Sequence, residues 1–160
     1  MGGRARGPVA AQAVQQKVPQ FAFWDTSALV PLCVQESRSA HALSLHKQYE
    51  IVVWWATPVE VASALTRLLR MKLLSAHDWA QARKTASIFA QAWTVVAPSN
   101  ELRAKALVMV ERYDLRAADA FQLAAALEWC VDVPQGRKFL TADARLFQAA
   151  LLSGFDAVNI

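Results

Sequence analysis

The stretch FAFWDTSALV, residues 21–30, decides how the rest of the chain is interpreted. Its first four residues are apolar and favour a β-strand, and this strand pattern ends at Asp25. A helical pattern begins immediately afterwards. A carboxylate between a strand and a helix either caps the helix through its side-chain oxygen or holds a ligand.

Short apolar segments and longer helical patterns alternate through the rest of the chain. We expect strands at residues 21–25, 51–55, 94–97, 138–141 and 156–159. We expect helices at residues 27–34, 37–48, 57–73, 76–92, 99–112, 117–130 and 143–152. Strands that are short, almost continuously apolar and separated by helices belong to a parallel sheet covered on both faces. The sequence therefore predicts the α/β class.

The composition fits one compact domain preceded by a basic segment. The chain has 160 residues, of which 55% are hydrophobic and 19% charged, and this is enough to form a sizeable core. We interpret residues 1–20 as a flexible tail and residues 21–160 as the domain. No apolar run reaches the roughly 18 residues of a membrane span, and the tail lacks a signal-peptide pattern. We therefore expect a cytoplasmic protein that does not associate with a membrane.

Three further carboxylates occupy places like that of Asp25. Glu60 follows the apolar run IVVWW, Asp119 opens the helix pattern of LRAADAFQLAAAL, and Asp143 follows the strand pattern in FLTADARLF. Because parallel strands end at the same edge of a sheet, these side chains should converge there. Carboxylates that converge repel one another, and a hard divalent cation such as Mg²⁺ or Mn²⁺ would neutralise them.

Each acid also has a purely structural explanation. Thr57, Pro58 and Glu60 match a capping box, in which the threonine caps a helix and the glutamate returns a hydrogen bond. The three aspartates can cap helix N-termini or complement the positive end of a helix dipole. Under this interpretation no acid needs a ligand.

Taken together, four motifs resemble those of a known family. DTSALV, VEVASAL, RAADAFQLAAAL and FLTADARL are similar, in order and spacing, to the four acidic motifs of PIN-domain ribonucleases, particularly the VapC-type toxins of toxin–antitoxin pairs. The resemblance runs from about Phe21 to the C-terminus. It implies a three-layer α/β/α sandwich around a mainly parallel five-stranded sheet. It also implies an endoribonuclease that uses Mg²⁺ or Mn²⁺, forms a homodimer and is blocked by a cognate antitoxin.

The resemblance assigns roles to individual residues. The catalytic and metal-binding positions fall on Asp25, Glu60, Asp119 and Asp143. Ser27 and Thr141 match hydroxyl residues that would orient a carboxylate or a water molecule. Independently of the resemblance, the position of Arg116 three residues before Asp119 makes it the candidate for a contact with an RNA phosphate.

Other features of the sequence leave alternatives open. Trp54 and Trp55 can stack on RNA bases, although we expect them in the core or in a dimer interface. A group of basic residues can follow the RNA backbone or solvate an outer helical face; these are Arg67, Arg70, Lys72, Arg83 and Lys84.

Two other functions compete with the nuclease. A catalytically silent PIN-like binding or regulatory subunit would keep the same acids. A phosphatase of the haloacid-dehalogenase kind would need a second aspartate two positions after Asp25, where this chain has Ser27.

Overall fold

Five strands form one fully parallel sheet in a computed structural model that describes residues 18–160. Their order across the sheet is β3-β2-β1-β4-β5. The strands are β1 (Gln20–Trp24), β2 (Tyr49–Trp54), β3 (Thr94–Val96), β4 (Lys138–Thr141) and β5 (Asp156–Asn159). The parallel five-stranded sheet predicted from the sequence is confirmed. Most of the predicted tail, residues 1–17, lies outside the described residues.

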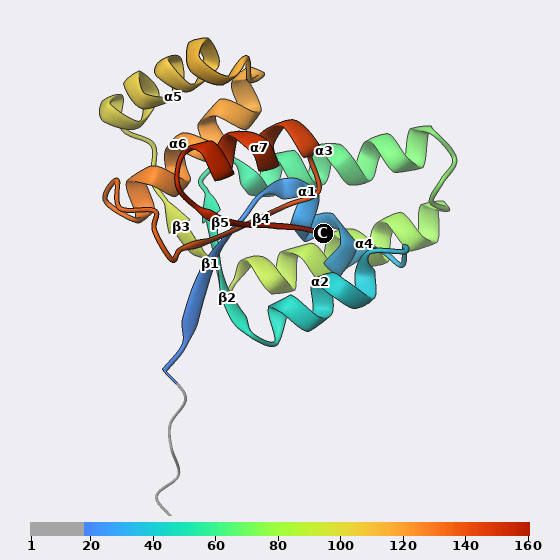
Figure 1. The fold of residues 1–160 in the computed structure, drawn as a ribbon. Helices are drawn as coiled ribbons and strands as arrows, with labels where there is room; N and C mark the ends of the chain where they lie inside the picture. Colours follow the sequence, from blue (N-terminus) through green and yellow to red (C-terminus); the bar gives the residue numbers. More distant parts are fainter. Residues whose placement is uncertain (1–17) are drawn as a thin grey trace, which may run out of the picture.

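Seven helices lie in the described part of the chain. They are α1 (Thr26–Cys33), α2 (Ser39–His46), α3 (Thr57–Arg70), α4 (Ala76–Ala90), α5 (Asn100–Tyr113), α6 (Ala117–Trp129) and α7 (Ala144–Leu152). Figure 1 shows α5, α6 and α7 on one side of the sheet and α2 and α4 on the other. Within residues 18–160, none of the helices combines the length and the apolar composition that crossing a membrane requires.

Two apolar cores fill the spaces between these layers. Because successive side chains of a strand point to opposite faces, Phe23 belongs to the core beneath α5, α6 and α7, while its neighbour Trp24 belongs to the core beneath α1 to α4. On β4, Phe139 and Leu140 divide in the same way. The predicted coverage of both faces is confirmed, and the domain is a three-layer α/β/α sandwich.

The parallel arrangement gathers several helix starts at one edge. All five strands end at the same edge, and α1, α3, α5 and α7 each begin within a few residues of a strand end. Their N-terminal N–H groups and positive dipole ends therefore surround the place where the predicted acids were expected to meet.

Candidate active site

All four predicted acids line one cavity of about 360 Å³, which we call the acid cavity. They come from separate elements: Asp25 follows β1, Glu60 lies in the first turn of α3, Asp119 lies in the first turn of α6, and Asp143 is the cap of α7. The predicted convergence at the carboxyl edge of the sheet is therefore observed.

Asp25 is the most tightly held of the four carboxylates, and its side chain is 5% exposed. Its Oδ2 atom accepts hydrogen bonds from the Ser27 hydroxyl, from the Ser27 N–H (3.1 Å) and from the Thr141 hydroxyl (3.0 Å). The N–H of Asp25 donates to the carbonyl of Leu140 (2.9 Å). Asp25 thus caps α1, as one of the two expected roles requires, and it also lines the acid cavity, while its role in holding a ligand stays a prediction.

Ser27 and Thr141 are the centre of a small hydrogen-bond network. The Ser27 hydroxyl accepts from the N–H of Ala142 (2.8 Å), and the Thr141 hydroxyl accepts from the N–H of Asp143 (3.0 Å). Since both hydroxyls also donate to Asp25, their protons and lone pairs have defined partners. These two side chains therefore fix the orientation of the Asp25 carboxylate.

Glu60 is held by residues that the sequence analysis did not select. Its Oε2 atom accepts from the Thr26 hydroxyl (2.6 Å) and from Nε2 of Gln122 (2.7 Å). Nε2 of Gln122 also lies 3.2 Å from the Thr26 hydroxyl and 3.4 Å from the Thr57 hydroxyl. The predicted capping box is wrong: α3 begins at Thr57 with no side-chain cap, because Thr57 and Glu60 both face Gln122 on α6.

Gln122 could have been noticed in the sequence as a polar residue inside an apolar helix. It lies three positions after Asp119, within the run AFQLAAAL, and is 1% exposed. A buried amide is nearly always hydrogen-bonded, so its presence there predicts a polar partner in the core. The sequence could not name that partner, since Glu60 lies 62 residues away.

Burial, and to a smaller extent the neighbouring carboxylates, raises the pKa of two of the acids. Burial raises the pKa of Asp25 from its ordinary value of 3.8 to about 6; the hydrogen bonds from Ser27 and Thr141 oppose this rise, and the charge of Asp119 adds to it. Burial also raises the pKa of Asp119, and the carboxylate of Asp143 raises it further. The expected repulsion between these acids is therefore present.

Several arginines surround the acids. Arg38 and Arg67 line the acid cavity. Arg116 is not part of that lining, yet its charge opposes the rise in the pKa of Asp119. Arg83, another basic residue selected from the sequence, lies on the opposite side of α3 from the acid cavity. Its guanidinium carbon is 5.2 Å from the ring centroid of Trp79. The remaining three do not line the acid cavity: Arg70, Lys72 and Lys84.

The oxygen atoms of the four acids suit a hard divalent cation. Each carboxylate keeps at least one oxygen without a donor from residues 18–160: Oδ1 of Asp25, Oε1 of Glu60, Oδ2 of Asp143 and both oxygens of Asp119. Within the same residues, no group of three or more His, Cys, Asp or Glu side chains is arranged so that it could hold a metal ion together. Mg²⁺ commonly takes one or two carboxylates and retains several waters, so an open site of this kind fits it.

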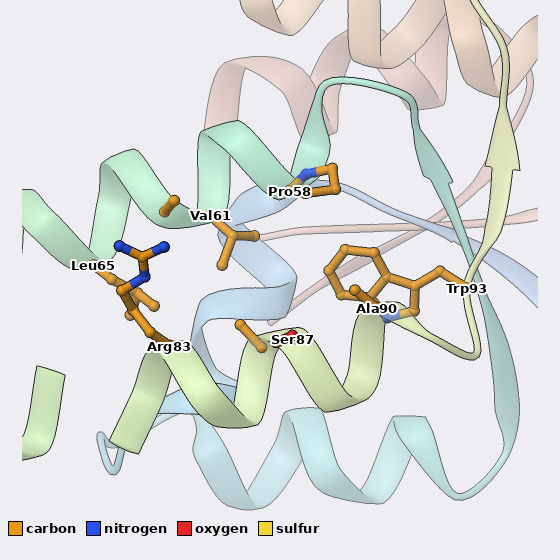
Figure 2. Close-up of a pocket in the computed structure, with 9 residues that line it drawn as sticks. Pro58, Val61, Leu65, Arg83, Ser87, Ala90 and Trp93 are labelled. Carbon is orange, nitrogen blue, oxygen red and sulfur yellow. The ribbon is translucent and has the colours of Figure 1, made fainter. Parts of the chain in front are cut away.

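A second cavity, of about 230 Å³, lies on the other side of α3 (Figure 2). Pro58, Val61 and Leu65 of α3 face residues of α4 across it, and Trp93 closes one end. Its lining is apolar apart from Arg83 and Ser87 and contains no carboxylate. This second cavity therefore offers no carboxylate to a cation.

Comparison with known proteins defines the family. The family model of the PIN domain matches residues 22–152 of the sequence, and the chain therefore belongs to the PIN domain family. PIN domains are generally nucleases. Comparison of the sequence with curated proteins gives no match.

Solved structures from several organisms share the fold. PAE2754 from Pyrobaculum aerophilum is 18% identical, with a TM-score of 0.61 over 88% of this chain and 89% of that one. A toxin–antitoxin complex from Klebsiella pneumoniae is 18% identical, with a TM-score of 0.56 over 79% and 89%. FitAcB from Neisseria gonorrhoeae is 14% identical, with a TM-score of 0.57 over 85% and 97%. At these identities the similarity establishes the fold.

The raised pKa of Asp25 predicts how stability depends on pH in the ion-free protein. Between pH 3.8 and about 6 the folded state retains a proton that the unfolded chain releases, so the free energy of unfolding falls as pH rises. Asp25→Asn removes this dependence. The stability of the variant relative to the wild type should therefore increase between pH 4 and pH 7, by at most about 3 kcal/mol.

Urea titrations across this pH range, with chelator present, measure the difference. Glu111→Gln, which makes the same chemical change at an exposed position of α5, is the matched control. If the free energies of unfolding of Asp25→Asn and the wild type differ by the same amount at every pH, the pKa of Asp25 is not raised in the folded protein.

Proposed function

We propose that this chain is a divalent-metal-dependent endoribonuclease that hydrolyses RNA phosphodiester bonds, and that it acts as the toxin of a type II toxin–antitoxin pair. The observation that carries the proposal is the acid cavity, in which four separate segments each contribute a carboxylate with a free oxygen. Membership of the PIN domain family supports the nuclease class.

The residues that would hold Mg²⁺ or Mn²⁺ are Asp25, Glu60, Asp119 and Asp143. A cation bound there would polarise the phosphodiester and lower the pKa of a water molecule near it. The cavity would accept the scissile phosphate only when its negative charge is balanced, since four carboxylates alone repel a phosphate. The arginines around the cavity contribute to that balance.

Within this mechanism the remaining residues act on the carboxylates. Ser27 and Thr141 hold one oxygen of Asp25, which leaves the other available as a ligand. Gln122 and Thr26 do the same for Glu60. Arg116, beside Asp119, is proposed to contact an RNA phosphate next to the scissile one.

The toxin assignment rests on the resemblance of the motifs and on the structural neighbours. The similar structure from Klebsiella pneumoniae is a toxin–antitoxin complex, and this supports a cognate antitoxin as partner. A homodimer and a cytoplasmic location belong to the same proposal. The antitoxin is expected to act by covering the acid cavity, because an occupied cavity excludes the RNA.

Cleavage of RNA tests the proposal directly. Purified protein without a partner is incubated with structured RNAs in Mg²⁺ or Mn²⁺, and discrete products are expected. EDTA should abolish them. Asp25→Asn and Asp119→Asn should each lower the rate by more than about 100-fold, beyond the 10–100-fold effect that loss of a residue supporting a metal ligand produces.

The exposed variant Glu111→Gln should cleave like the wild type. Cleavage that persists in EDTA would contradict the role of the metal. A wild type that binds Mn²⁺ but cleaves no RNA would favour the regulatory subunit over the nuclease.

Gln122→Leu tests the support of Glu60. The substitution keeps the bulk of the side chain and removes the amide that donates to Glu60, so we expect kcat to fall about 10–100-fold with little change in KM. Gln148→Leu, at an exposed position of α7, makes the same change away from the cavity. Unaltered kcat in Gln122→Leu, measured on folded protein, would show that Glu60 does not need this contact.

A further inference from the structure

A third cavity, of about 450 Å³, lies along the same edge of the sheet as the acid cavity. We call it the aromatic cavity. Trp54 and Trp55 at the end of β2 contribute to it, and so do the connection from β3 to α5 and Phe121 of α6. Figure 1 shows β3 beside α6, with α5 further out.

The two cavities share structural elements. Trp55 lies in the connection that leads from β2 to Glu60, and Phe121 follows Asp119 by two residues on α6. Neighbouring strands are about 4.8 Å apart, so the end of β2 lies one strand spacing from the end of β1, where Asp25 is found. The aromatic cavity is therefore within reach of a nucleotide that flanks a phosphate in the acid cavity.

The two tryptophans differ in exposure. Trp54 is 6% exposed and stacks in parallel on Phe121, with 5.5 Å between ring centroids and an interplanar angle of 1°. Trp55 is 59% exposed and meets Trp54 edge-on at 6.4 Å. The backbone N–H of Trp55 donates to the carbonyl of Val96 (3.1 Å), and this hydrogen bond fixes the backbone of Trp55 to β3. Trp54 thus belongs to the core, while Trp55, whose backbone is held to β3, exposes most of its side chain to solvent.

The polar part of the lining carries positive charge. Arg103 of α5 lies on the wall of the cavity, and no ion pair in residues 18–160 includes it. Ser99 and Asn100 add a hydroxyl and an amide at the N-terminus of α5, and the lining contains no acid. An exposed aromatic ring beside an unpaired guanidinium suits a flat, hydrogen-bonding group attached to a phosphate.

We propose that the aromatic cavity binds an unpaired base of the RNA, stacked on Trp55 with Arg103 against its edge or its phosphate. This inference rests on the proposed nuclease function and deepens it. The enzyme would then select sites where a base next to the scissile phosphate is free to leave its helix, as in a loop or a bulge, because a paired base cannot enter the cavity. Trp55 is a residue that binds substrate and takes no part in the chemistry of cleavage.

The experiment separates base recognition from cleavage. A short fluorescein-labelled single-stranded RNA of mixed sequence and an abasic strand of the same length are titrated with protein in Ca²⁺, so that the carboxylates are balanced, and gel electrophoresis checks that neither strand is cut during the measurement. The wild type should bind the base-containing strand about 5- to 150-fold more tightly, the range expected for one stacked base. Trp55→Ala should bind both strands alike, whereas Trp55→Phe should keep most of the preference.

Two controls accompany the titration. Val131→Ala removes an exposed apolar side chain outside the cavity and should retain the full preference. Gel filtration of each variant reports its oligomeric state. If Trp55→Ala dissociates a dimer and weakens binding of both strands equally, a second copy of the chain covers the cavity and the proposal is wrong.

The remaining outcomes distinguish this proposal from the nuclease function. If the wild type cleaves RNA in the presence of metal but Trp55→Ala keeps the preference for bases, the base site is wrong and the nuclease stands. If the wild type neither cleaves RNA nor binds either strand, the base site and the nuclease function are both wrong.

Discussion

The hydrogen bond from Thr141 to Asp25, supported by those from Ser27, joins the central strand β1 to its neighbour β4 at the edge where the acid cavity forms. Asp25 directly follows β1, and Thr141, 116 residues later in the chain, is the last residue of β4. The same contacts cap α1, and Thr141 also accepts from the N–H of Asp143. Two of the four acids are therefore positioned by one short network, and the geometry of the cavity depends on it.

This arrangement places like charges together, and the fold opposes their repulsion only in part. The pKa of Asp25 and that of Asp119 are both raised, first by burial and then by neighbouring carboxylates. Helix N-termini and nearby arginines reduce the effect without removing it. An acidic site that lowers the stability of the ion-free protein at neutral pH is consistent with a site whose balancing charge arrives from solution.

The sequence was sufficient for features set by local pattern and by the geometry of parallel sheets. Strand positions follow from apolar runs, and the meeting of the four acids follows from the common edge of the strands. The sequence was insufficient where contacts between residues far apart in the chain override the preferences of a local motif. Glu60 matched a capping box but bonds to Gln122, and Trp54 and Trp55 looked alike although only Trp54 is buried. Arg116 was selected for its spacing, whereas Arg38 reaches the cavity through the fold.

Isothermal titration calorimetry of the purified, partner-free protein with Mn²⁺ at neutral pH would show directly whether the acid cavity binds a metal ion. We expect the wild type and the exposed control Glu111→Gln to bind the ion, and Asp25→Asn, still folded by circular dichroism, to lose it. Equal binding by Asp25→Asn and the wild type, or no binding by the wild type, would contradict a metal site that includes Asp25. In either case Asp25 would be a helix cap and a link between strands, and nothing more.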